Sequence, residues 1–97
     1  MNELVFAPLA ERDLEDIGDY IAQDNPRAAV RMLKALHDQC ALVARRPLLY
    51  PVRADIGPDF RHALVKPYGI WYRILPGEVR IERILHGARD LPTLLKP

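Results

Sequence analysis

The fold is decided by one stretch near the C-terminal end, Tyr68–Asp90, which reads YGIWYRILPGEVRIERILHGARD. Two runs within it, 70–75 and 79–85, are rich in apolar, β-branched and aromatic residues, as strands are. Pro76-Gly77 joins them and favours a tight turn, because proline presets φ at the first central position and glycine accepts a positive φ at the next. The stretch therefore predicts a β-hairpin whose second strand carries the polar residues of 86–90 to the edge of a sheet.

The first half of the chain predicts a short strand and two amphipathic helices. The strand is Leu4-Val5-Phe6, and Pro8 suits the first helical turn because its missing N–H costs nothing there. Asn25 and Pro26 are typical of the N-cap and first residue of a second helix, which Arg45-Arg46-Pro47 closes. Apolar residues recur at helical spacing in both helices: Ala10, Leu14, Ile17 and Ile21, then Ala29, Leu33, Leu36, Cys40 and Val43.

Residues 47–59 hold three prolines and a glycine, which predicts an ordered but irregular loop. A second strand follows over Phe60–Val65, and Lys66-Pro67-Tyr68-Gly69 turns it into the hairpin. Residues 89–95 allow a short helical turn, which Pro92 limits in length. The predicted fold is α+β with the order β-α-α-β-β-β, an antiparallel sheet and a helix hairpin packed on one face, in a single domain over residues 1–97.

Composition limits the possible functions. The 97 residues are 49% hydrophobic and 28% charged, as expected of a folded domain, and the net charge of +1 argues against a dedicated DNA-binding protein. The single cysteine, Cys40, excludes an intrachain disulfide and fits a reducing cytosol. The sequence shows no targeting or membrane segment, metal-ligand spacing, Gly-rich phosphate loop or Ser-His-Asp set. We therefore expect a cytoplasmic protein without metal or cofactor, with no specific DNA binding and no membrane partner.

In the order of these features the chain resembles the ParE/RelE superfamily of bacterial toxins from type II toxin–antitoxin systems, and more specifically its ParE branch. The resemblance covers nearly the whole chain. It rests on A-x-x-D-L-x-x-I-x-x-Y-I at residues 10–21, N-P-x-x-A at 25–29, Arg46-Pro47, Tyr68-x-x-x-Tyr72-Arg73, and R-I-L-H-G-A-R-D at 83–90.

The two branches of this superfamily imply different activities. RelE-like members are ribosome-dependent messenger RNA endonucleases that place basic residues on the sheet, whereas ParE-like members inhibit DNA gyrase. At the RelE positions this chain has Phe60 and His62 on strand two, Gly69 after Tyr68, Arg89 after the last strand, and Leu95 near the end. Arg89 is kept and His62 is a weak substitute, so the phosphate-binding set is largely missing.

The resemblance therefore favours a non-enzymatic toxin that binds gyrase, with no catalytic residue. The rival is a RelE-type endonuclease, whose catalytic set would be Arg61, His62, His86 and Arg89. A third possibility is a member that has lost toxicity and survives as an antitoxin-binding module.

His86 and Arg83 each have more than one interpretation. His86 could be a general acid or base, or a hydrogen-bonded structural histidine. Strict alternation places Arg83 in phase with Val79, Ile81 and Leu85, the expected core-facing set. A buried charge needs a partner, so we expect an acid from the first helix or the tail, unless a bulge turns Arg83 outward.

Two further positions, Arg89 and Arg61, are ambiguous in the same way. Arg89 could pair with Asp90 to fix the tail, or contact a target, and Arg61 could be a solvated edge charge. Trp71 and Tyr72 are expected to pack in the sheet.

The resemblance also implies partners. We expect a hetero-oligomer with a cognate ParD-like antitoxin, whose C-terminal segment wraps the toxin. An amphipathic helix of that segment would lie in a groove at the hairpin edge or along the exposed strands, and strand addition could extend the contact. The predicted antitoxin contacts are Leu9, Leu14, Met32, Leu48, Leu49 and Tyr50. The predicted contacts with the target are Arg61, Arg83, Arg89, Leu94, Leu95 and Lys96.

Overall fold

The computed structural model describes residues 2–87, and their elements follow the predicted order. The elements are β1 (Glu3–Phe6), α1 (Pro8–Ala22), α2 (Pro26–Arg45), a short 3-10 helix η1 (Pro47–Leu49), β2 (Arg61–Val65), β3 (Tyr68–Leu75) and β4 (Glu78–His86). The helical turn predicted over 89–95 lies outside the described residues. No helix within 2–87 has the length and apolar character needed to cross a bilayer.

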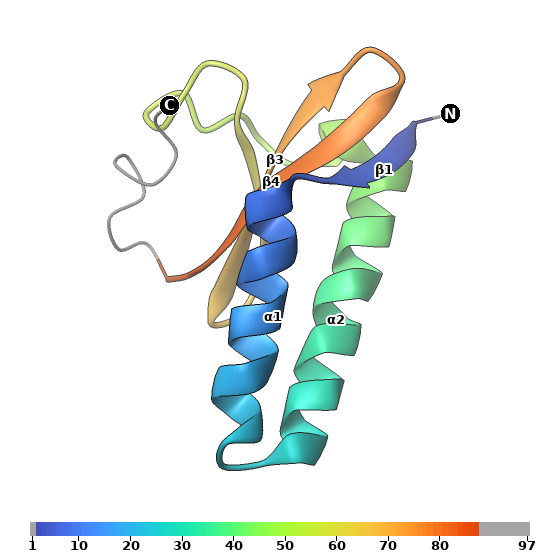
Figure 1. Cartoon of the computed structure of the whole chain (residues 1–97). Helices are drawn as coiled ribbons and strands as arrows, with labels where there is room; N and C mark the ends of the chain where they lie inside the picture. The colour runs from blue at the N-terminus through green and yellow to red at the C-terminus, as the bar shows by residue number, and fades with distance from the viewer. Residues whose placement is uncertain (1, 88–97) are drawn as a thin grey trace.

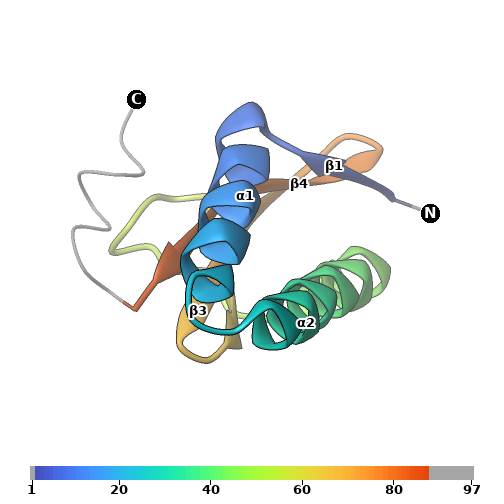
Figure 2. The same cartoon turned by 60° about the horizontal axis from the view of Figure 1, so that its bottom comes forward.

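The two helices form the predicted antiparallel hairpin and cover one face of the sheet (Figures 1 and 2). The second helix begins as expected: the side chain of Asn25 accepts a hydrogen bond from the Ala28 N–H at 3.0 Å, and Pro26 follows it. Gly18 is the point of closest approach, since a Cβ there would lie 3.0 Å from Cδ1 of Leu33. A glycine that weakens an isolated helix therefore lets α1 and α2 pack closely.

The sheet has the order β1-β4-β3-β2, and its last three strands are antiparallel as predicted. β1 differs, because it pairs in parallel with β4, from Glu3 opposite Glu78 to Phe6 opposite Ile81. The chain between β1 and the other strands passes through both helices, and a crossover of that length can join parallel strands. The sheet is therefore mixed.

The predicted hairpin is formed by β3 and β4, with Gly77 at φ +75°. The turn before it is shorter than expected, because Tyr68 and Gly69 already belong to β3 and leave only Lys66-Pro67 between the strands.

A bulge in β4 overturns one expectation about the core. Trp71 lies opposite Arg83 but Tyr72 lies opposite Ile81, so Glu82 is an extra residue in the strand. Such an insertion shifts the side-chain alternation by one position. After the bulge Ile84, and not Leu85, joins the main core.

The main core packs the two helix stripes against β3 and β4, and a smaller cluster lies on the opposite sheet face. Trp71 and Leu85 form that smaller cluster with Ile56 and Phe60. Trp71 and Tyr72 are both buried as predicted, although on opposite faces. The fully buried main-core residues include Leu36, Cys40, Val43, Ile70, Tyr72, Val79 and Ile81.

The irregular loop after α2 is anchored to this core. The Tyr72 hydroxyl donates a hydrogen bond of 2.6 Å to the Pro47 carbonyl, and burial raises the pKa of Tyr72 to about 12. Val52 forms an isolated bridge with Arg61, which extends the sheet beside β2. The predicted ordered loop is therefore held at its start and near its middle.

Arg83 has the partner that its position demands. Its Nε and Nη2 donate to the two carboxylate oxygens of Asp13 in α1 at 2.8 and 3.0 Å, and the side chains are 16% and 12% exposed. Asp13 also accepts the Ile84 N–H at 2.9 Å. Because β1 pairs with β4 only as far as Ile81, this carboxylate satisfies a strand edge that would otherwise be open.

Replacing Asp13 with alanine should lower the free energy of unfolding by about 2–3 kcal/mol, because the mostly buried guanidinium of Arg83 and the backbone N–H of Ile84 lose their hydrogen-bond acceptor. Urea denaturation followed by circular dichroism measures the change. The control is Asp38→Ala, which breaks the exposed Lys34–Asp38 pair of α2 (2.8 Å) and should cost less than about 0.5 kcal/mol. Equal losses in the two variants would contradict a special role for Asp13.

Candidate functional site

The sheet face that the helices leave uncovered carries most of the polar side chains of β3 and β4. We call it the open face; its residues are His62 and Leu64 of β2, Gly69, Trp71 and Arg73 of β3, and Glu78, Arg80 and Glu82 of β4. The resemblance to RelE-like toxins implies basic residues on a sheet face, and two of the positions concerned, 62 and 69, lie on this one.

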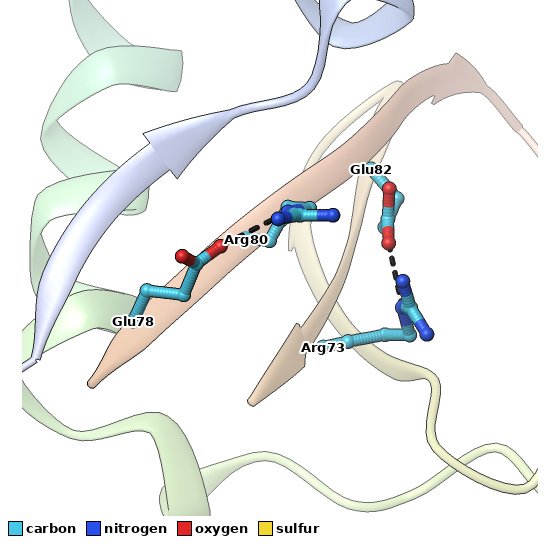
Figure 3. Close-up of polar contacts among 4 residues, drawn as sticks. All are labelled: Arg73, Glu78, Arg80 and Glu82. Carbon is cyan, nitrogen blue, oxygen red and sulfur yellow. Dashed lines mark hydrogen bonds and ion pairs between the residues drawn. The ribbon is translucent and has the colours of Figure 1, made fainter. Parts of the chain in front are cut away.

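Two arginines of the hairpin, Arg73 and Arg80, are paired with carboxylates of the same hairpin, as Figure 3 shows. Nε of Arg73 lies 2.6 Å from a carboxylate oxygen of Glu82, and Nε of Arg80 lies 3.0 Å from one of Glu78. A phosphate would have to compete with these carboxylates for each guanidinium. The open face is therefore less attractive to RNA than its arginine content indicates.

The neighbouring loop repeats this pattern. Two nitrogens of Arg53 donate to the two carboxylate oxygens of Asp55 at 2.9 and 2.8 Å. The same guanidinium lies 5.4 Å from the ring centroid of Trp71, a distance typical of a cation–π contact.

His62 lies flat on Trp71, with ring centroids 4.1 Å apart and an interplanar angle of 19°. Gly69 makes room for this stack, because a Cβ at position 69 would lie 2.6 Å from Nε2 of His62. The imidazole therefore fills the space in which a longer residue after Tyr68 would have to fit. The departures from the RelE pattern at 62 and 69 are parts of one packing arrangement.

This packing sets the protonation of His62. Burial lowers the pKa of the imidazole, and the nearby Arg53 guanidinium lowers it further, so the ring is neutral at pH 7. The indole N–H of Trp71 beneath it is buried and has no acceptor among residues 2–87. A hollow of about 430 Å³ adjoins the stack and is lined by Arg53, His62, Leu64, Lys66, Pro67, Gly69 and Gly87.

The proposed nuclease residues do not come together within the described part of the chain. Arg61 points to the helix side, where its Nη1 donates to the Tyr50 carbonyl at 2.6 Å, whereas His62 is on the open face. His86 is exposed at the end of β4, with its ring edge-on to Tyr68 at 5.4 Å. No hydrogen bond of the His86 side chain occurs within residues 2–87, so the predicted structural bond is not found there. Arg89 lies outside the described residues.

The predicted antitoxin contacts fall into two groups. Leu9, Leu48 and Leu49 are exposed. Leu14, Met32 and Tyr50 are half-buried against the main core, and the Tyr50 hydroxyl accepts a 2.9 Å hydrogen bond from Gln39.

The sequence prediction missed most of a groove of about 490 Å³ between the helices. Among its lining residues only Leu14 was predicted as an antitoxin contact. The lining residues are Leu14, Glu15, Gly18, Asp19, Ala22, Pro26, Ala29, Val30 and Leu33. The small residues Gly18 and Ala22, four apart on α1, are the signal that could have located it.

The chain is similar to known proteins over nearly its whole length. Residues 4–91 match the family model described as the ParE toxin of the type II toxin–antitoxin system parDE. Toxin RelE2 of Caulobacter vibrioides is 37% identical over 91 residues, which cover 92% of this chain and 99% of the relative. A solved chain from the chromosomal ParDE TA system of P. aeruginosa has a TM-score of 0.79 at 22% identity, with 91% of this chain and 98% of that chain covered. This structural likeness concerns the fold alone.

The His62 environment predicts a specific titration. In the intact protein His62 should titrate below its ordinary value of 6.5, and Arg53→Gln should raise its pKa toward that value because a nearby cation is removed. NMR of the imidazole carbon-bound protons against pH measures both. Because the unfolded chain binds this proton more readily, the stability linked to His62 is present above pH 6.5 and is lost as pH falls through the folded pKa.

The matched control is Arg27→Gln, which removes an exposed arginine from α2 and should leave the His62 titration unchanged. A wild-type midpoint at or above 6.5 would contradict the buried stack.

Proposed function

The chain belongs to the ParE toxin family of type II toxin–antitoxin systems, and on that premise we propose that it acts by binding DNA gyrase and not by cutting RNA. The observation that carries the proposal is the internal pairing of charges on and beside the open face: Arg73 and Arg80 of the face, and Arg53 of the neighbouring loop, each have a carboxylate partner.

The chemistry of RNA cleavage explains why this observation matters. Attack by a 2′-hydroxyl needs a base, cationic groups that stabilise the charge developing on the phosphate, and an acid for the leaving oxygen. On the open face the arginines that could stabilise the phosphate are engaged, and the His62 imidazole occupies the space beside Gly69 where a further cation would have to fit. The geometry favours a surface that docks against a protein.

The gyrase contact is proposed for the C-terminal tail. Of the six predicted target contacts, the guanidinium groups of Arg61 and Arg83 are held by Tyr50 and Asp13. The proposed contact therefore centres on Arg89, Leu94, Leu95 and Lys96, which lie outside the described residues.

A second candidate function, ribosome-dependent cleavage of messenger RNA, is favoured by one observation. His62 is neutral and borders a hollow that also presents Arg53 and Lys66, so its imidazole could accept a proton there. The two functions make opposite predictions for a His62 variant.

We expect purified protein to inhibit gyrase supercoiling of relaxed plasmid at micromolar concentration and to leave messages in a translating ribosome intact. His62→Gln should retain the inhibition and the growth arrest, because the stack has no chemical role in docking. Gel assays of plasmid topology and primer extension on ribosome-bound message measure the two activities.

Unchanged supercoiling together with codon-specific cleavage that His62→Gln or Arg89→Ala abolishes would establish the endonuclease instead. Absence of growth arrest when the protein is expressed alone would identify the third possibility, an antitoxin-binding module without toxicity.

We further propose a ParD-like antitoxin as partner, with its C-terminal segment held as an amphipathic helix in the groove between α1 and α2. The groove combines an apolar floor with exposed Val30 and with the acids Glu15 and Asp19 at its border. An apolar floor with a charged border is the usual setting for helix-in-groove recognition.

Deleting the C-terminal segment of the antitoxin should abolish the complex, and Val30→Glu should weaken it by at least about 10-fold, because a charge would enter the apolar contact. Isothermal titration calorimetry measures the affinity. Arg31→Glu, a change at an exposed position of α2 outside the groove lining, is the control. Tight binding of the truncated antitoxin would refute the groove as the main site.

A further inference from the structure

A second hollow, of about 390 Å³, lies on the other side of α1 from the groove. It is lined by Asp16, Ile17, Tyr20, Tyr68 and His86, and we call this set the aromatic hollow. Three of the five residues have aromatic rings, one is a carboxylate, and Ile17 is a buried member of the main core.

Two simple neighbour relations bring these side chains together. Asp16 and Tyr20 are four residues apart on α1 and so lie on the same side of the helix. Tyr68 and His86 are directly opposite each other in the β3–β4 register, with their rings edge-on at 5.4 Å. The helix therefore supplies one half of the aromatic hollow and the strand ends supply the other.

The hollow is suited to a cation. Asp16 is exposed and has no ion-pair partner among residues 2–87. Burial raises the pKa of Tyr68, and the nearby Tyr20 raises it further, so the phenol is neutral at pH 7. Neutral aromatic rings attract cations at their faces, and a carboxylate beside them adds to that attraction.

The acidic charge of α1 as a whole also favours a cation in this hollow. Its acids are Glu11, Asp13, Glu15, Asp16 and Asp19, and its only basic residue is Arg12. Asp13 is used internally by Arg83, but Glu15 and Asp19 border the groove and Asp16 borders the aromatic hollow. The outer part of α1 is thus an acidic ridge with a hollow on each side.

We propose that the aromatic hollow receives an arginine side chain of the antitoxin, which fixes the position of the antitoxin segment across α1. This inference rests on the proposed antitoxin partner. The guanidinium lies against the rings of Tyr20 and Tyr68, and Asp16 accepts its hydrogen bonds. Apolar residues of the same segment occupy the groove, so the cation sets orientation and specificity while the groove provides apolar contact.

The site can be tested without antitoxin or gyrase. The probe is N-acetyl-arginine amide, added to the full-length protein and followed by NMR of the Tyr20, Tyr68 and His86 rings; N-acetyl-citrulline amide is its neutral counterpart. We expect saturable shifts with arginine and at least about 3-fold weaker binding of citrulline. Asp16→Asn and Tyr20→Ala, both at exposed positions, should each weaken arginine binding by about 3- to 10-fold.

Glu11→Gln is the matched control, because it removes one acid from α1 outside the lining of the hollow. Equal binding of citrulline, absence of ring shifts, or equal weakening by Glu11→Gln and Asp16→Asn would overturn the cation site.

The antitoxin as the source of the arginine is tested by double-mutant cycles in the complex. One antitoxin arginine should couple to Asp16, so that its alanine variant and Asp16→Asn together weaken the complex by less than the product of their separate effects. Arginine binding in the hollow without any such coupling would overturn the assignment to the antitoxin. Failure of the proposed toxin function would appear in different experiments, as unchanged gyrase supercoiling and as normal growth when the protein is expressed alone.

Discussion

The carboxylate of Asp13 ties α1 to β4 at the bulge, and the arrangement of both sheet faces depends on this contact. It accepts hydrogen bonds from the Arg83 guanidinium and from the Ile84 N–H, two groups that would otherwise be left at an unpaired strand edge. With the extra residue Glu82 accommodated, Ile84 enters the main core and Leu85 packs with Trp71. The same contact holds α1 beside the end of β4, which places Asp16 and Tyr20 near Tyr68 and His86.

The two sides of the sheet differ in electrostatic character. On the open face, arginines and glutamates of one hairpin neutralise each other, and His62 is kept neutral by burial and by Arg53. On the helix side, α1 presents acids with no cation partner among the described residues. A basic protein segment is therefore attracted to the exposed acids of α1, while little net charge is available on the open face to hold a phosphate.

The packing of His62 on Trp71 contributes to this electrostatic difference, because burial of the imidazole lowers its pKa. The imidazole occupies the space above Gly69, so a larger residue at position 69 would require the His62 ring to move. The two residues that depart from the RelE pattern, His62 and Gly69, therefore fit together in one packing arrangement.

By itself, the sequence determined the order of elements, both helices with their starts at Pro8 and at Asn25-Pro26, and the β3–β4 hairpin. These features follow from rules that act over a few residues: proline and asparagine at helix starts, apolar spacing, and a Pro-Gly turn. The local pattern also indicated that Arg83 needs a partner. Of the residues that line the groove between α1 and α2, however, only Leu14 was among the predicted antitoxin contacts.

Only the tertiary structure decided the parallel pairing of β1, the bulge, the placement of Arg61 and His62 on opposite faces, and the two hollows beside α1. Each depends on contacts between distant parts of the chain, such as the Asp13–Arg83 pair, which is separated by 70 residues. A one-residue insertion in a strand changes the facing of every later side chain, and strict alternation has no means of locating it.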